Sequence, residues 1–216
     1  MKKIGVLGTG SVGTTIGSKL IQLGYEVKLG SRTPDNETAA EWVKNNGLKA
    51  SQGTFEAAAN FGGIIFLCVK GEAALKVLEM AKEENLNGKT VIDISNPLDF
   101  SKGMPPTLFV CNTDSLAEQI QRAFAEVNFV NTLNIVNCDV MVNPKISGGD
   151  PTMFLCGNDP NAKEEAKEIL KQFGWNDIID LGDISAARGT EMILPIWLQI
   201  WNALQDGHFA FKILRK

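Results

Sequence analysis

The stretch KKIGVLGTGSVG, residues 2–13, decides the fold of this chain. Its first half is a short apolar strand, and its second half is a loop in which Gly8, Gly10 and Gly13 form the pattern G-x-G-x-x-G. A helical pattern over residues 11–23 follows, so the loop joins a strand to a helix as in dinucleotide-binding proteins. The first glycine allows a tight turn, the second lets a pyrophosphate approach the backbone, and the third lets the helix pack on the strand. The stretch predicts a Rossmann-type domain; a glycine-rich turn without a ligand is the alternative.

Strand and helix patterns alternate along the rest of the chain. Strands are expected at residues 2–7, 26–30, 64–69, 90–94, 129–133, 152–156 and 178–181, and helices at 11–23, 35–46, 54–60, 72–84, 115–126, 161–173 and 185–205. Asp114 is expected to cap the fifth of these helices, and residues 96–106 form a loop. The alternation predicts an α/β fold with a doubly wound parallel sheet. A boundary after Leu133 would separate an NADP-binding domain, residues 1–133, from a smaller C-terminal α/β domain, residues 134–216.

The tip of the second strand indicates which dinucleotide binds. An NAD-specific site usually carries an acidic residue there, about 20 residues after the glycines, to accept hydrogen bonds from the ribose. This strand instead ends in Gly30-Ser31-Arg32. Ser31 can donate to a phosphate oxygen, and Arg32 can pair with a 2′-phosphate that a carboxylate would repel. The sequence therefore favours NADP over NAD, although a solvated loop charge is the ordinary role of a surface arginine.

The composition is that of an ordinary globular protein, with 44% hydrophobic residues, 21% charged residues and a formal net charge of −4. No basic stripe is present, so nucleic acid is not an expected partner. The longest apolar stretch, residues 193–204, is interrupted by Pro195, Gln199 and Asn202. A membrane span needs about 20 apolar residues, so we expect no membrane partner and a cytoplasmic location.

The cysteines give no metal-binding pattern. None of the four belongs to a CxxC pair, and His208 is the only histidine in the chain. A zinc site would need widely separated ligands, so reduced and mostly buried thiols are expected instead. The cysteines are Cys68, Cys111, Cys138 and Cys156.

Five motifs together carry a family resemblance: residues 8–13, residues 30–32, DISNPL at 93–98, NTLN at 131–134 and DLGDISAARG at 180–189. The first two motifs are widespread, whereas the last three are more specific in this order. The chain resembles the deazaflavin (coenzyme F420)-dependent NADP oxidoreductases, which pass a hydride between NADP and the deazaflavin. It is also similar to the cytosolic oxidoreductase domain of the six-transmembrane metalloreductases.

The resemblance implies a role for each matching position. Ser31 and Arg32 would hold the 2′-phosphate, and Val69 and Lys70 would border the dinucleotide. Asn96 would lie at its nicotinamide end. The residues implied to wrap the pyrophosphate are Thr9, Gly10, Ser11 and Val12.

The same resemblance implies a cleft for a second substrate between the two domains. Pro97 and Leu98 would line its entrance. Asn134 would lie in the cleft, at a position where the deazaflavin enzymes can carry histidine, and this departure weakens the case for coenzyme F420 itself. Asn36 falls where a further basic residue could have supported the 2′-phosphate.

The chain offers few candidates for a general acid or base. His208 lies near the C-terminus, and Tyr25 follows a helix-ending glycine, so neither is expected to be catalytic. Hydride transfer between two flat rings requires mainly position and orientation from the protein. We therefore expect no catalytic side chain, no metal, NADP as cofactor and a flavin-like or deazaflavin molecule as second substrate. The rival hypotheses are a reductase of small imines and an NADPH-binding sensor without turnover.

The C-terminal helix leaves further alternatives open. Its apolar residues surround it on nearly every side, so we expect it to form a homodimer interface or a cleft wall, or simply to pack in the core. Trp197 and Trp201 lie on one face and could flank a planar ligand. Glu191 could be an acid in the cleft, but a charge near the helix start, close to Ser185 and Arg188, is the favoured interpretation. Arg188 is read either as a contact to an acidic ligand or as an ion-pair partner of Asp183 or Glu191.

Overall fold

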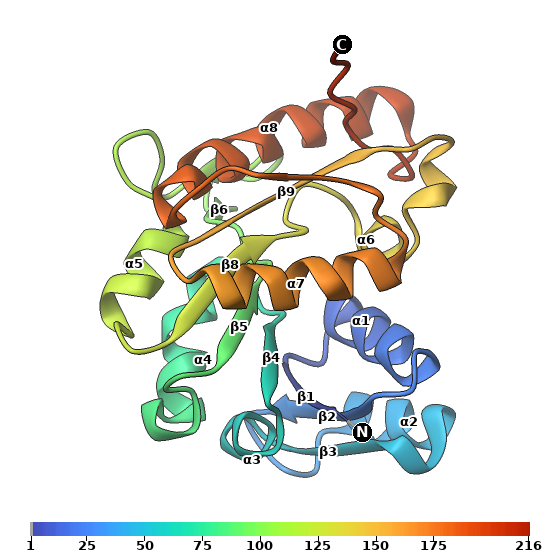
Figure 1. Ribbon diagram of the computed structural model, residues 1–216, viewed down its shortest axis with the longest axis vertical. Helices are drawn as coiled ribbons and strands as arrows, with labels where there is room; N and C mark the ends of the chain where they lie inside the picture. The colour runs from blue at the N-terminus through green and yellow to red at the C-terminus, as the bar shows by residue number, and fades with distance from the viewer. Residues whose placement is uncertain (1) are drawn as a thin grey trace.

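The computed structural model describes residues 2–216, and one eight-stranded sheet organises them (Figure 1). The strand order is β3-β2-β1-β4-β5-β8-β9-β10. The strands are β1 (Lys3–Leu7), β2 (Glu26–Ser31), β3 (Ala50–Thr54), β4 (Ile64–Leu67), β5 (Thr90–Asp93), β8 (Asn128–Thr132), β9 (Thr152–Gly157) and β10 (Asp177–Asp180). The first six in this order are parallel, and β9 runs antiparallel to β8. The predicted α/β class with a Rossmann-type sheet is confirmed.

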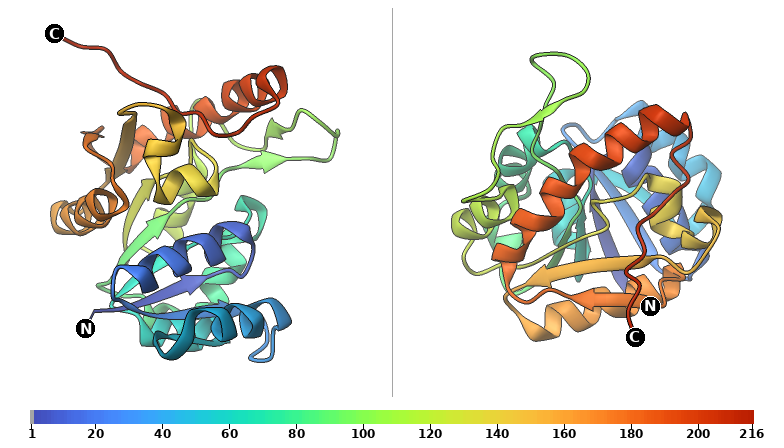
Figure 2. Two further views of the ribbon diagram at one scale, coloured as in Figure 1. Left: turned by 90° about the vertical axis from the view of Figure 1, so that its right-hand side faces the viewer. Right: turned by 90° about the horizontal axis from the view of Figure 1, so that it is seen from above.

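Helices cover both faces of this sheet (Figure 2). They are α1 (Ser11–Gln22), α2 (Glu37–Asn46), α3 (Phe55–Phe61), α4 (Ala74–Ala81), α5 (Leu116–Ala123), α6 (Cys138–Val142), α7 (Pro160–Phe173) and α8 (Ala187–Leu204), with short 3-10 turns at Gly47–Lys49, Gly71–Ala73, Glu83–Asn85, Pro144–Ser147 and Ile184–Ala186. No helix within residues 2–216 is long and apolar enough to cross a membrane.

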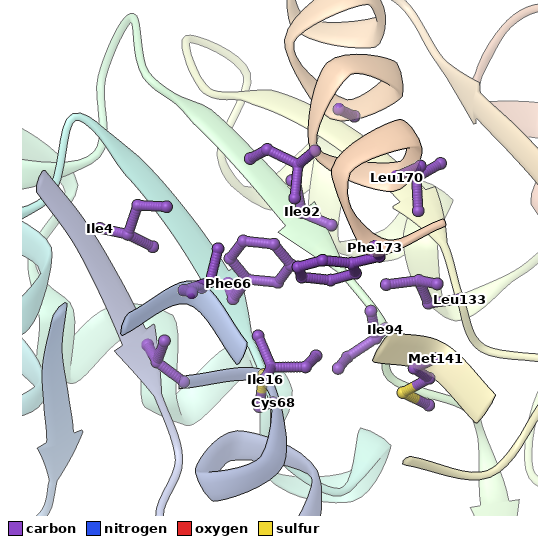
Figure 3. Close-up of a cluster of buried hydrophobic side chains, with 14 of the residues drawn as sticks. Ile4, Ile16, Phe66, Cys68, Ile92, Ile94, Leu133, Met141, Leu170 and Phe173 are labelled. Carbon is purple, nitrogen blue, oxygen red and sulfur yellow. The ribbon is translucent and has the colours of Figure 1, made fainter. Parts of the chain in front are cut away.

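The central strand β4 shows why the sheet needs two helix layers. Its four residues, IIFL, are all buried, and they alternate between two apolar cores because side chains along a strand point to opposite faces. Phe66 belongs to one core and stacks on Phe173 of α7, with ring centroids 6.5 Å apart (Figure 3). Ile65 and Leu67 enter the other core, which α3, α4 and α5 cover. A strand buried on both faces is the expected centre of a parallel sheet.

Three local expectations were wrong or incomplete. Strand β3 was not predicted because its sequence, ASQGT, lacks the β-branched apolar residues that mark a strand. The expected loop at residues 96–106 contains part of a small hairpin, β6 (Leu98–Asp99) paired with β7 (Thr107–Leu108). Ser115, and not Asp114, caps α5 by accepting a hydrogen bond from Glu118 N, because Asp114 instead pairs with Arg122.

The last third of the chain extends the same sheet. β9 pairs with β8, and Phe173 packs against Phe66 of the N-terminal part, so one core crosses residue 133. The C-terminal tail then lies along β9, where Thr152 N donates to Phe211 O at 2.9 Å. The division into domains after Leu133 stays a prediction.

Candidate functional site

A cleft of about 920 Å³ opens at the carboxyl ends of β1, β2, β4 and β5. In a parallel sheet this edge is where ligands bind, at the point where the strand order reverses. Eleven of the fourteen predicted site residues line the cleft: Gly8, Thr9, Gly10, Ser11, Val12, Ser31, Arg32, Val69, Lys70, Asn96 and Leu98. Gly13, Pro97 and Asn134 are not among the lining residues.

The three glycines of the loop meet different constraints. Gly8 has a φ of +131°, and an added Cβ would collide with the Cys68 carbonyl. At Gly13 an added Cβ would collide with the Gly8 carbonyl, so this glycine lets α1 approach the loop. Gly10 has an ordinary φ of −74°, and an added Cβ would meet nothing within 4 Å. The protein itself does not require a glycine at position 10, but a ligand close to the backbone would.

The N-terminus of α1 is open toward the cleft. Gly10 is its N-cap, and no side chain accepts a hydrogen bond from the first turn. By contrast, side chains cap α2, α3, α5, α6 and α7. The first N–H groups of a helix lack intrahelical partners and carry the positive end of the helix dipole, so they form an anion site. The pyrophosphate of a dinucleotide fits this loop.

The tip of β2 supplies polar groups to one end of the cleft. Arg32 is exposed, and no carboxylate within residues 2–216 forms an ion pair with it. Ser31 is buried and donates its hydroxyl to Thr33 O, so in this arrangement its oxygen is left to accept. Asn36 accepts from Ala39 N at 2.9 Å to cap α2, which leaves its amide nitrogen as a donor. The Arg32 guanidinium and the Asn36 amide nitrogen are donors that suit a phosphate, whereas the Ser31 hydroxyl would have to turn away from Thr33 O to donate to one.

The segment after β5 forms the other end of the cleft. Asn96 Nδ2 donates to Asn134 O at 2.8 Å, and Asn134 Nδ2 donates to Asn96 Oδ1 at 3.1 Å. Asn134 is only 2% exposed and lies behind Asn96, which explains why it does not line the cleft. Leu98 and the half-exposed Phe100 add apolar surface from the hairpin.

Sequence reasoning missed several lining residues: Thr33, Phe55, Cys68, Gly71, Glu72, Ala73, Val77, Ile94, Ser95 and Phe100. Most of them are chain neighbours of predicted residues at the ends of β2, β4 and β5, so extending each motif by a few residues would have found them. Phe55 follows β3, which gave no sequence signal.

Two expectations about the start of α8 are corrected. Glu191 is buried and accepts hydrogen bonds from Leu116 N at 2.9 Å and Ala117 N at 3.0 Å, so it lies on the N-terminus of α5. Burial raises the pKa of the Glu191 carboxyl to about 8, against the opposing effect of these two hydrogen bonds. Arg188 forms its ion pair with Glu118, not with Asp183 or Glu191, because the turn before α8 faces α5.

Of His208 and the four cysteines, Cys68 alone lines the cleft. His208 contacts Asp206 and Asp139 in an exposed group on the tail. Cys68 and Cys156 are buried, but Cys111 is exposed and Cys138 half-buried, so fewer thiols are buried than expected. Burial raises the pKa of the Cys156 thiol to about 12. No group of three metal-binding side chains occurs within residues 2–216.

The two tryptophans of α8 stack with ring centroids 6.2 Å apart. Trp197 is buried, as core packing requires, and Trp201 is 41% exposed. Neither residue lines the cleft, so in this structure they do not flank a ligand there. The homodimer through α8 stays a prediction.

Comparison with known proteins agrees with this geometry. The family model for coenzyme F420-dependent NADP oxidoreductases matches residues 3–97. The F420-dependent NADP reductase of Methanocaldococcus jannaschii is 30% identical over 203 residues, which cover 90% of each chain. A crystal structure of a protein assigned as an F420-dependent NADP reductase, from Arthrobacter sp. FB24, superposes with a TM-score of 0.95 at 45% identity and covers the whole of both chains.

A second group of relatives is larger than this chain. Metalloreductase STEAP3 of Rattus norvegicus is 27% identical over 201 residues, which cover 90% of this chain but only 38% of the metalloreductase. The matches to the reductases extend over nearly the whole chain and therefore define its family relationship. The glycine loop at residues 8–13, the tip of β2 and the segment after β5 all fall within the matched region. The chain belongs to the family of F420-dependent NADP oxidoreductases and is an NADP-dependent oxidoreductase.

Proposed function

We propose that this protein transfers a hydride between NADPH and a flavin-like or deazaflavin acceptor. The observation that carries the proposal is a single cleft with an open helix N-terminus in its middle, an exposed arginine at one end and an apolar entrance at the other. The cleft thus offers one region for each part of the reduced dinucleotide and a neighbouring place for a flat acceptor.

Each region of the cleft has a role in binding. The first N–H groups of α1 would hold the pyrophosphate, and Gly10 would leave it room. Arg32 would pair with the 2′-phosphate, supported by the amide nitrogen of Asn36. With the adenosine at β2, the nicotinamide end would reach Ser95 and Asn96. When bound, the nicotinamide ring supplies the hydride.

The lining residues favour an acceptor that needs no proton donor from the protein. Within the described chain, neither His208 nor Tyr25 lines the cleft. Its ionisable side chains besides Arg32 are Cys68, Lys70 and Glu72, which directly follow β4, and burial raises the pKa of the Cys68 thiol. Leu98 and Phe100 present apolar surface to a planar ring and would exclude water from the gap between two stacked rings. A flavin-like or deazaflavin ring matches this requirement because it accepts a hydride directly.

The experiment that tests this proposal follows the hydride itself. NADPH deuterated at C4 of the nicotinamide is mixed with the protein and, in separate reactions, with coenzyme F420, FMN and a cyclic imine. We expect deuterium in the reduced deazaflavin or turnover with the flavin, and little turnover with the imine. Turnover confined to the imine, or no NADPH oxidation with any acceptor, would overturn the proposal.

A further inference from the structure

A chain of buried polar side chains connects α8 with the Ser95–Asn96 segment of the cleft. Asp93 is the last residue of β5, and its carboxyl Oδ1 accepts from Ser95 N at 2.9 Å and from Ser95 Oγ at 2.7 Å. Asn131 is its register partner on β8, with Nδ2 3.4 Å from Asp93 O and 3.5 Å from Asp93 Oδ2. Thr190 of α8 completes the chain, because its hydroxyl lies 3.0 Å from Asn131 Oδ1, closer than the 3.2 Å to Ala187 O of its own helix.

All four members of this hydrogen-bonded chain are almost completely shielded from water. Asp93, Ser95, Asn131 and Thr190 are each at most 2% exposed. Buried polar groups cost free energy unless each finds a partner, so losing one member leaves the next without its hydrogen bond. In the arrangement observed, both the oxygen and the nitrogen of the Asn131 amide have partners. The link between Asn131 and Asp93 is the longest and therefore the weakest of the chain.

The segment that this chain reaches is held tightly from the other sides as well. Asn96 shares two hydrogen bonds with Asn134, and an added Cβ at Gly71 would collide with the Asn96 carbonyl. Ser95 and Asn96 line the cleft at the end opposite Arg32. Figure 1 shows α8 lying above the upper ends of β5 and β8, which is consistent with the contact between Thr190 of α8 and Asn131 of β8.

We propose that Asp93 is a positioning residue for the nicotinamide end of the cleft, and that Thr190 makes this positioning depend on α8. The inference rests on the proposed function. Asp93 does not line the cleft, so it acts through Ser95 and through the orientation of the neighbouring Asn96. A reacting ring misplaced by about 1 Å can lose about a hundredfold in rate, so a modest loosening of this segment is measurable.

The test compares two substitutions that remove the same chemical group. Thr190→Val removes the hydroxyl at the far end of the chain without touching the cleft. Thr132→Val is the matched control, because Thr132 is equally buried. Its hydroxyl bonds only to Phe154 O at 2.7 Å, which is not part of the hydrogen-bonded chain from Thr190 to Ser95. Hydrogen exchange of segment 93–98 in the free protein reports the coupling without any nucleotide. The fluorescence of bound NADPH and the hydride-transfer rate report the position of the ring.

We expect Thr190→Val to accelerate exchange in segment 93–98 and to lower the hydride-transfer rate about tenfold. Its affinity for adenosine 2′,5′-bisphosphate, which lacks the nicotinamide, should equal that of the wild type. The control should lose comparable stability but change neither the exchange of the segment nor the rate. Asp93→Asn keeps the acceptor for Ser95 but places an amide nitrogen against Asn131, so the same effects should be larger if this variant folds.

Two failures are distinguishable. If Thr190→Val and Thr132→Val have the same effect on the exchange of segment 93–98, the inference is overturned whatever the enzyme does. If the wild type binds no NADPH, the proposed function fails, and a positioning role for Asp93 fails with it. Faster exchange of segment 93–98 in Thr190→Val alone, together with an unchanged hydride-transfer rate, would also overturn the positioning role.

Discussion

The N-termini of α1 and α5 make a useful comparison because both present backbone N–H groups that need an acceptor, but the acceptor has a different source at each. At α5, Ser115 caps the helix, and the buried carboxyl of Glu191 accepts from the N–H groups of Leu116 and Ala117. At α1, the cap is Gly10, and no side chain occupies the position. One helix end is therefore completed by the fold itself, whereas the other is left for a ligand. The difference separates residues that stabilise the protein from residues that bind.

The largest effect is expected at the open end. Gly10→Val places its Cβ where the protein has no atoms within 4 Å, so the substitution should not disturb the fold but should block a pyrophosphate. We expect NADPH affinity to fall at least about a hundredfold, which is about 2.7 kcal/mol, with little change in Tm. Calorimetric titration and thermal unfolding measure the two quantities.

Gly149→Val is the control for this experiment. Gly149 also has open space around it and lies outside the cleft, so its substitution should leave NADPH affinity unchanged. Equal NADPH affinity of wild type and Gly10→Val would show that the open end of α1 is not a phosphate site.

The filled end should behave in the opposite way. Glu191→Gln keeps one acceptor but places an amide N–H₂ against a backbone N–H, so the free energy of unfolding should fall by about 1–3 kcal/mol. NADPH affinity should hardly change because Glu191 does not line the cleft. Denaturant unfolding checks the first statement, with the exposed Glu79→Gln as control. A large loss of NADPH affinity at unchanged stability would contradict the comparison.

A smaller effect is expected from pH. The pKa of Glu191 is raised to about 8 by burial, so the folded state holds this proton more tightly than the unfolded chain does. The resulting stability is fully present below the ordinary glutamate pKa and is lost as the pH rises through about 8. The stability difference between wild type and Glu191→Gln should therefore narrow from about pH 5 to about pH 8. A difference that is constant or grows with pH would mean that Glu191 is already ionised at low pH.

The same contrast explains how much the sequence could predict. Residues next to each other in the chain create the open end, so the motif at residues 8–13 was sufficient to place it. The partner of α5 lies about 75 residues away in sequence, and nothing local to Glu191 indicates it. Likewise the Asn96–Asn134 pair depends on strands β5 and β8 being neighbours, which only the folded sheet reveals.

The strands also divide into those that the sequence predicted and those that it did not. Those of the core, such as β4, carry continuous apolar runs and were predicted, since burial on both faces requires them. The edge strand β3 needs only Ala50 and Gly53 in contact with the core, so its sequence gives no apolar signal. The strands β6 and β7 of the hairpin are too short to show an alternation of apolar and polar residues.

The most direct test of the central claim, an NADP site running from the open end of α1 to Arg32, is a paired titration of NADPH and NADH. Wild type and Arg32→Ala are compared, with Arg122→Ala as the control because it removes the same charge at a residue that does not line the cleft. We predict that wild type and control bind NADPH at least about tenfold more tightly than NADH, a difference of about 1.4 kcal/mol, and that Arg32→Ala loses this preference. Equal affinities for NADPH and NADH in the wild type, or no binding of either, would contradict the account.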